Sequence, residues 1–336
     1  MRQKGRATIV DVAAEAGVSV TTVSHVLSGR RPVSAATRAR VEDVVRRLGY
    51  QADPSARGLR TQRTRLLGLV VPDITNPFNA ELAAGLQEAA LARDYLTVVC
   101  ETPKEPSRVR AVMRQLTARR IDGLVLGRYA TGEGVLDPLL ATGAPVVRLG
   151  GRLDAGPGDV VHAAETEGMR DLVRHLVRDR GYRRIGFIGG ARGAEPGGER
   201  HRGYREALAE AGLAVPEELV AWTDFTREGG RAGAARLLAA AEPPDAIVCA
   251  NDLIAIGALD TARASGLPVP GRVAITGYDD IEAAALVSPA LTTVLNPARE
   301  IGRTAARLLA DRLDGEDRGP ARELLLAHRL VRRESA

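Results

Sequence analysis

From Leu66 onward, short apolar runs alternate with segments of helical periodicity, and this alternation restricts the possible folds more than any other feature. The apolar runs lie at 66–71, 96–100, 121–126, 145–149, 185–189, 218–222, 245–249, 272–276 and 291–295. The helical segments lie at 79–93, 106–119, 133–141, 166–179, 200–211, 228–241, 252–264 and 297–313. Such alternation is typical of an α/β fold with parallel sheets flanked by helices. The part of the chain from Leu66 onward is too long for one such sheet, so we expect two sub-domains.

The chain before residue 50 shows three short helical patterns instead. Thr8 can cap the first helix, which Gly17 ends. Ser19 can cap a second helix that runs to about Ser28, and a third helix follows Ser34. Two short helices joined by a turn that contains glycine form a helix-turn-helix. We therefore expect an all-α helix-turn-helix headpiece.

The second of these helices has two different faces. Val23, Val26 and Leu27 share the face expected to pack on the first helix. The opposite face carries side chains short enough for the major groove, mostly able to hydrogen bond: Val20, Thr21, Ser24 and His25. The alternative is that this face is only the solvated surface of a small three-helix bundle.

Charge is divided unequally along the chain. Residues 1–65 hold 13 basic and five acidic side chains, a net of 13 − 5 = +8. The remaining residues hold 34 basic and 37 acidic groups, a net of 34 − 37 = −3. Because neutralised phosphates supply most sequence-independent affinity for DNA, the basic segment favours the DNA-binding interpretation of the headpiece. It also favours treating the two parts as separate domains.

Several classes of protein are excluded. No apolar run approaches the roughly 20 residues of a membrane span, and no signal-peptide core follows the N-terminus. We therefore expect a cytoplasmic protein with no membrane partner, in which Cys100 and Cys249 are free thiols. The sequence contains no phosphate-binding loop, no G-x-G-x-x-G, no G-x-S-x-G, no H-E-x-x-H and no C-x-x-C. It predicts no enzyme, no metal site and no cofactor.

Ligands of open α/β sheets bind beyond the carboxyl ends of the strands. The residues that follow the predicted strands are Asp73, Asn76, Phe78, Arg128, Tyr129, Arg148, Arg200, Trp222, Phe225, Asn251, Asp252, Tyr278 and Asp279. Although aromatic residues make up only 3% of the chain, several of them fall in this set. This mixture of aromatic and polar side chains predicts a binding cleft.

Residues 8–33 (TIVDVAAEAGVSVTTVSHVLSGRRPV) resemble the DNA-binding headpiece of the lac-repressor (LacI/GalR) family. The resemblance implies that Val20, Thr21 and His25 read bases and that Ser19, Thr22 and Ser24 contact phosphates of double-stranded operator DNA. Residues 54–60 (PSARGLR) resemble the hinge helix of the family, which places Arg57 and Leu59 at the DNA. Leu59 matches the leucine that wedges into the minor groove. The alternative for Leu59 is a linker residue.

The rest of the chain resembles the effector-binding core of the same family, which is similar to periplasmic sugar-binding proteins. The matching segments are 76–78 (NPF), 121–123 (IDG), 181–185 (GYRRI), 250–252 (AND), 277–280 (GYDD) and 288–294 (SPALTTV). The resemblance implies polar effector contacts from Arg200, Asn251 and Asp279, stacking from Phe225, and a place for Phe78 in the effector-facing loop. Asn251 as a helix cap and Asp279 as a turn residue are the structural alternatives. Residues 163–165 (AAE) and the glycine-rich 190–199 loop depart from the family pattern.

The sequence thus predicts a helix-turn-helix headpiece with a hinge (1–60) and a two-lobed, periplasmic-binding-protein-like core (61–336). The two lobes are expected at about 66–163 plus 295–318 and 164–292 plus 319–333. The predicted function is a transcriptional regulator, expected to be a repressor, that binds a palindromic operator as a homodimer. Its DNA affinity would respond to a small-molecule effector, for which a sugar is expected and a purine or another metabolite is an alternative. A transport-type sugar-binding protein is the other candidate.

Overall fold

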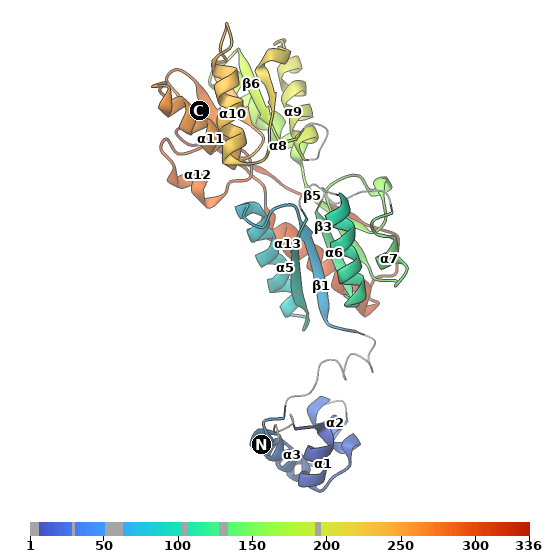
Figure 1. Cartoon of the computed structure of the whole chain (residues 1–336). Helices are drawn as coiled ribbons and strands as arrows, with labels where there is room; N and C mark the ends of the chain where they lie inside the picture. The colour runs from blue at the N-terminus through green and yellow to red at the C-terminus, as the bar shows by residue number, and fades with distance from the viewer. Residues whose placement is uncertain (1–6, 29–30, 51–62, 103–105, 128–133, 192–195) are drawn as a thin grey trace. The chain divides into compact units, whose positions relative to one another are not determined.

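The computed structural model describes residues 7–28, 31–50, 63–102, 106–127, 134–191 and 196–336. It divides into two compact units, Met1–Thr64 and Arg65–Ala336 (Figure 1). The predicted hinge helix, with Arg57 and Leu59, lies outside the described residues.

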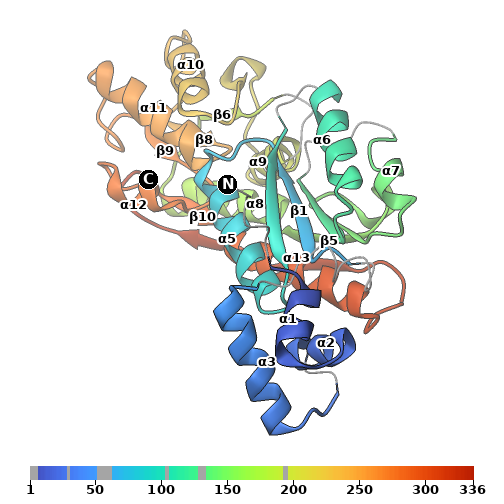
Figure 2. The same cartoon turned by 60° about the horizontal axis from the view of Figure 1, so that its bottom comes forward.

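The first unit contains α1 (Ile9–Ala16), α2 (Val20–Ser28) and α3 (Ala35–Leu48), which pack together at the bottom of Figure 2. The caps fall where the sequence placed them. The Thr8 side chain accepts from the backbone N–H of Asp11, whose carboxylate accepts from the backbone N–H of Thr8, so the capping box is complete. Gly17 ends α1 in the left-handed region at φ 60°.

Seven buried side chains from the three helices form the core of this unit: Val12, Ala13, Ala16, Val23, Val26, Val41 and Val44. Leu27 was predicted to pack inward, but its side chain is 41% exposed. At the end of so short a helix, the inward face is already filled by Val23 and Val26.

The second unit has two lobes, each built on a parallel sheet (Figure 1). The sheet of the first lobe has the strand order β11-β5-β4-β3-β1-β2. Its strands are β1 (Leu66–Val71), β2 (Leu96–Glu101), β3 (Gly123–Gly127), β4 (Val146–Leu149), β5 (Asp159–Ala163) and β11 (Glu323–Leu326). Helices α5 (Pro77–Leu91) and α13 (Ala298–Asp314) share one buried cluster with the sheet. Helices α6 (Pro106–Ala118) and α7 (Asp137–Leu140) share another.

The second lobe is built on a four-stranded parallel sheet with the order β7-β6-β8-β9. Its strands are β6 (Ile185–Gly189), β7 (Val220–Trp222), β8 (Ala246–Cys249) and β9 (Ala274–Thr276). Its helices are α8 (Glu165–Arg174), continued by a π-helical turn at His175–Asp179, α9 (Gly197–Glu210), α10 (Arg227–Leu238), α11 (Asp252–Ala264) and α12 (Glu282–Leu286). Helix α8 packs beside α9, and α10 beside α11. The predicted strand–helix alternation and parallel pairing are confirmed.

The chain passes between the lobes three times: from β5 into α8, from β10 (Thr293–Leu295) into α13, and from β11 to β12 (Arg329–Val331). The sequence assigned residues 319–333 to the second lobe, and this is wrong for β11. Strand β11 pairs in parallel with β5 and completes the edge of the first sheet. Only β12, which pairs antiparallel with β10, follows the predicted assignment.

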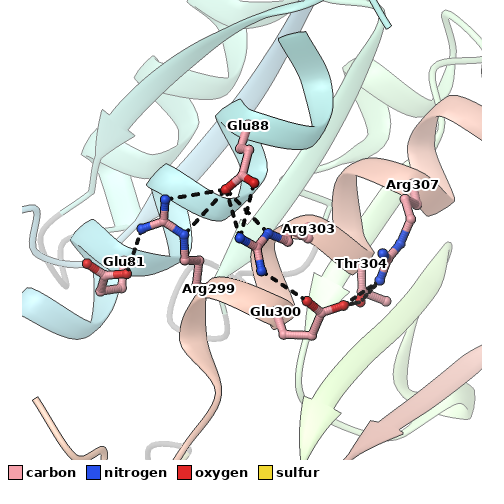
Figure 3. Close-up of polar contacts among 7 residues, drawn as sticks. All are labelled: Glu81, Glu88, Arg299, Glu300, Arg303, Thr304 and Arg307. Atoms are coloured by element: carbon pink, nitrogen blue, oxygen red, sulfur yellow. Dashed lines mark hydrogen bonds and ion pairs between the residues drawn. The ribbon is translucent and has the colours of Figure 1, made fainter. Parts of the chain in front are cut away.

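Helices α5 and α13 lie side by side and approach very closely (Figures 1 and 2). A Cβ atom at Gly302 would lie 2.1 Å from the carbonyl oxygen of Leu82, and one at Gly85 would lie 2.0 Å from that of Arg299. The same helix pair carries a network of ion pairs on its exposed side (Figure 3). There the carboxylate of Glu88 forms ion pairs with Arg299 at 3.3 Å and with Arg303 at 3.0 Å.

Two further sequence predictions concern cysteines and membranes. Cys100 and Cys249 are free, and Cys249 is buried. Within the described ranges, no helix is both long and apolar enough to cross a bilayer.

Candidate functional site

The first candidate site is the exposed side of α2 in the first unit. Thr21 is exposed and Val20 is 41% exposed, while Ser24 and His25 are half-buried. Ser19 caps the helix, because its Oγ accepts from the backbone N–H of Thr22 at 3.1 Å. Of the eight side chains predicted to meet DNA, the six of the headpiece therefore lie at the start of α2 and along this helix.

The arginines of α3 differ in their pairing. Arg47 forms an ion pair with Glu15 at 2.6 Å, and Arg46 forms one with Asp43 at 3.4 Å. Arg40 is exposed, and no ion pair of its side chain is found among the described residues. Among the described residues of this unit, part of the positive charge is thus paired with carboxylates, and Arg40 is exposed.

The second candidate site is a cavity of about 480 Å³ in the second unit. Residues of both lobes line it, among them Phe78 at the start of α5 and Arg200 in α9. All five residues predicted to contact an effector are present in its wall: Phe78, Arg200, Phe225, Asn251 and Asp279. Its volume falls within the range of sites that hold small molecules.

Arg200 is the centre of a buried polar cluster at this cavity. Its side chain donates from Nε to Glu165 at 2.6 Å and from Nη2 to Asp279 at 3.0 Å. It also donates to the carbonyl oxygen of Ala250, and its guanidinium lies over the ring of Tyr278, 3.9 Å from the centroid. Only 2% of Arg200 is exposed, so these contacts hold the guanidinium in one place.

Asp279 is the second carboxylate at this guanidinium, and it accepts from Nη2. Its Oδ1 also accepts from Nδ2 of Asn296 at 3.2 Å. Burial, together with the charge of Glu165, raises the pKa of Asp279 to about 6, although Arg200 acts in the opposite direction. The pKa of Arg200 is raised above its ordinary value by Asp279 and Glu165 against the effect of burial. Two carboxylates thus share one guanidinium.

The two phenylalanines are held by local backbone features. Asn76 caps α5 by accepting from the N–H of Phe78 at 3.0 Å, and Pro77 occupies the first turn. Phe225 packs directly on the glycine-rich loop, since a Cβ atom at Gly190 would lie 1.9 Å from its ring. Gly190 therefore makes room for an aromatic wall of the cavity.

Asn251 caps a helix and also lines the cavity. Its Oδ1 accepts from the N–H of Ile254 at 2.9 Å and caps α11, as the structural alternative proposed. Its Nδ2 lies 3.5 Å from the carbonyl oxygen of Phe225, and the residue still lines the cavity.

Four residues predicted to follow strands do not line the cavity: Arg148, Trp222, Asp252 and Tyr278. Arg148 donates to backbone carbonyl groups of residues 152–157 instead. Asp252 is fully buried and accepts from Thr293 Oγ1 at 2.6 Å and from the N–H of Ile281 at 2.8 Å. Burial raises its pKa well above the ordinary value. Arg128 and Tyr129 lie outside the described residues.

Two members of the polar cluster were missed as site residues, Glu165 and Asn296. Both lie where the chain passes between the lobes, Glu165 at the start of α8 and Asn296 just before α13. Glu165 belongs to the 163–165 departure from the family pattern, which was the one sequence signal for its role. Nothing in the local sequence marked Asn296.

A helix-turn-helix unit joined to a two-lobed α/β unit with a cavity between the lobes defines a DNA-binding transcriptional regulator. The chain belongs to the LacI family of bacterial regulatory proteins. The model of that family matches residues 8–53, and a periplasmic binding protein-like domain matches residues 173–336. The protein is therefore a regulator, not an enzyme or a transport-type binding protein.

Known relatives match along almost the whole chain. The HTH-type transcriptional regulator CelR of Thermobifida fusca is 36% identical over 340 residues, covering 99% of both proteins. A solved structure of a CelR–cellobiose complex has 35% identity and a TM-score of 0.74, covering 98% of this chain and 100% of that one. The lac repressor dimer bound to operator and the anti-inducer ONPF has 26% identity and a TM-score of 0.88, covering 98% of each chain. The fold predicted from the sequence is confirmed.

Proposed function

We propose that this regulator is a repressor whose affinity for operator DNA is controlled by a sugar bound in the cavity. The observation that carries the proposal is the composition of the cavity wall. Phe78 and Phe225 offer apolar surfaces to a sugar ring, and Asn251, Arg200 and Asp279 offer donors and acceptors to its hydroxyl groups. The CelR–cellobiose complex supports a sugar over a purine.

On the DNA side, we propose base contacts from Val20, Thr21 and His25 and phosphate contacts from Ser19, Thr22 and Ser24. Leu59 is proposed to wedge into the minor groove, and Arg57 to contact the DNA. A homodimer would bring two such headpieces to a palindromic operator in the cytoplasm, where the DNA is. The operator-bound lac repressor dimer supports this arrangement.

The proposed domains are the headpiece with its hinge, 1–60, and the core, 61–336. The division of the structure between Thr64 and Arg65 supports a boundary close to this position. With β11 counted in the first lobe, the proposed lobes are 66–163 plus 295–326 and 164–292 plus 327–333.

The test is DNA binding, measured by fluorescence anisotropy on the protein's own upstream DNA, with and without a panel of neutral mono- and disaccharides. One or more sugars should shift the dissociation constant for DNA at least about tenfold, in either direction, because either sign needs only a difference in affinity between two states. A protein that binds no DNA at low salt, or DNA affinity that no sugar alters, would contradict the proposal.

A pair of variants separates the cavity from the rest of the molecule. Phe225→Ala should weaken the response to the sugar at least about tenfold and leave DNA binding without sugar unchanged. The control is Ile74→Ala, since Ile74 is exposed and lies in the loop before α5 but does not line the cavity. Equal effects of both substitutions would argue against a ligand in the cavity.

A further inference from the structure

The described residues that line the cavity carry an excess of negative charge. Four carboxylates are among them, those of Asp73, Glu165, Asp224 and Asp279. Arg200 is the only lysine or arginine in this set. An anionic group on a ligand would therefore lie next to more acidic than basic side chains.

The single guanidinium of this set is already engaged. Its donors go to Glu165, Asp279 and the carbonyl oxygen of Ala250, and its face is covered by Tyr278. A phosphate or carboxylate group binds arginine through the same donors, in a paired geometry. It would have to displace a carboxylate of the protein from a buried ion pair to do so.

Glu165 is one of the two carboxylates that form ion pairs with Arg200. Its Oε2 lies 2.6 Å from Nε of Arg200, whereas Oδ1 of Asp279 lies 3.0 Å from Nη2. Its Oε1 lies 3.4 Å from Nδ2 of Asn296, which also holds Asp279. Only 8% of Glu165 is exposed, and it lines the cavity, so its charge is little screened by solvent.

We propose that Glu165 makes the cavity selective for uncharged sugars, because it occupies Arg200 and presents negative charge where a phosphorylated or carboxylated sugar would bind. This inference rests on the proposed function of the cavity and narrows its ligand class. Neutral hydroxyl groups are accepted, since a carboxylate is a good acceptor for them. Sugar phosphates, uronates and aldonates are rejected by like charge.

The first test compares each sugar with its own anion on the full-length protein. Isothermal titration calorimetry at pH 8 measures glucose against glucose 6-phosphate and glucuronate, ribose against ribose 5-phosphate, and cellobiose against cellobionate. The anion of any sugar that binds should bind at least about 100-fold more weakly. An anion that binds within about threefold of its neutral sugar, or more tightly, overturns the selectivity.

The second test is Glu165→Gln, which keeps the size of the side chain and frees Arg200 from one carboxylate. The preference for the neutral sugar over its anion should fall at least about tenfold. The matched control is Glu167→Gln, which removes an exposed carboxylate two residues further along α8 and should leave the preference unchanged. An unchanged preference in folded Glu165→Gln overturns the role of Glu165.

The outcomes also separate this inference from the function on which it rests. If neither neutral sugars nor anions bind or alter DNA affinity, the proposed function is wrong. If an anion binds well and alters DNA affinity, the sugar-controlled function stands and the selectivity falls. If Glu165→Gln does not fold, the comparison of neutral and anionic sugars on the unaltered protein decides.

Discussion

Asp279 combines an unusual backbone conformation with a buried carboxylate. Its backbone lies at φ 109°, a region that a non-glycine residue seldom occupies, and Asp280 follows at φ 56°. Hydrogen bonds from Arg200 and Asn296 hold its carboxylate in the wall of the cavity. The strained turn therefore presents a carboxylate, and the cluster around it keeps the turn in place.

This arrangement predicts a pH dependence of stability. The pKa of Asp279 in the folded protein, about 6, lies above its ordinary 3.8, so the folded state binds the proton more tightly than the unfolded chain. The resulting stabilisation is fully present below pH 3.8 and is lost as pH rises through 6. It amounts to roughly 3 kcal/mol at most, from about 1.4 kcal/mol for each pKa unit.

The measurement is urea denaturation of the unaltered protein and of Asp279→Asn, each at pH 4.5 and 7.5. Asn cannot titrate, so the unaltered protein should lose free energy of unfolding relative to the variant as pH rises. Arg200, Glu165 and Asp252 act on the same carboxyl and are present in both proteins. A difference between the two proteins that is the same at both pH values would rule out the raised pKa.

A second prediction at this scale concerns the outward side of α2. Thr21→Ala should weaken binding to the operator by about tenfold and change binding to unrelated DNA little, because a base contact discriminates by about 1–3 kcal/mol. Competition gel shifts on the operator and on a scrambled duplex measure both affinities. An equal loss on both duplexes would assign Thr21 to the phosphates or to folding.

At the scale of the elements, helix caps and hydrophobic periodicity were enough to predict most of the helices and strands. Thr8, Ser34 and Gly49 bound their helices as expected, and α11 runs over the residues predicted for it. Strands β5, β11 and β12 were missed as strands. Strand β11 pairs with β5, which lies far before it in the chain, so no local pattern specifies that pairing.

The same dependence on local sequence explains which residues of the cavity could be predicted. Residues that directly follow a parallel strand or begin the next helix can be located from the strand pattern, and this rule placed Phe78, Asn251 and Asp279. Glu165 and Asn296 belong to segments that pass between the lobes. Their meeting depends on the three-dimensional course of the chain, which periodicity does not contain.

The close approach of α5 and α13 gives a prediction about packing. Gly302→Ala should lower the free energy of unfolding by about 1–3 kcal/mol, because the new methyl group would overlap the backbone carbonyl of Leu82. In an unobstructed helix the same change stabilises by up to about 1 kcal/mol. Urea denaturation measures the effect. Arg307→Ala, an exposed change on α13, is the control, and a Gly302→Ala protein as stable as the parent would contradict the overlap.

At the scale of the whole molecule, the net charges of +8 and −3 predict a steep salt dependence of DNA binding. Affinity for any duplex should fall by at least about tenfold between 50 and 200 mM salt, since bound phosphates release their counterions. Binding of a neutral sugar to the cavity should change little over the same range. Anisotropy and calorimetry across a salt series measure the two. DNA affinity that does not respond to salt would exclude the arginines of the headpiece as phosphate contacts.

The three passages between the lobes also set the order in which the nascent chain can fold. Strands β1 to β5 leave the ribosome before the second lobe, but α13 and β11, which cover and complete their sheet, are made only after the second lobe's sheet and flanking helices. The sheet and flanking helices of the second lobe come from one uninterrupted stretch, from α8 to α12. During synthesis this sheet and its helices can therefore form before the first sheet is complete, and β12 joins the second lobe last. The first lobe must wait with Leu67 and Leu69 only partly covered until α13 arrives to pack on them.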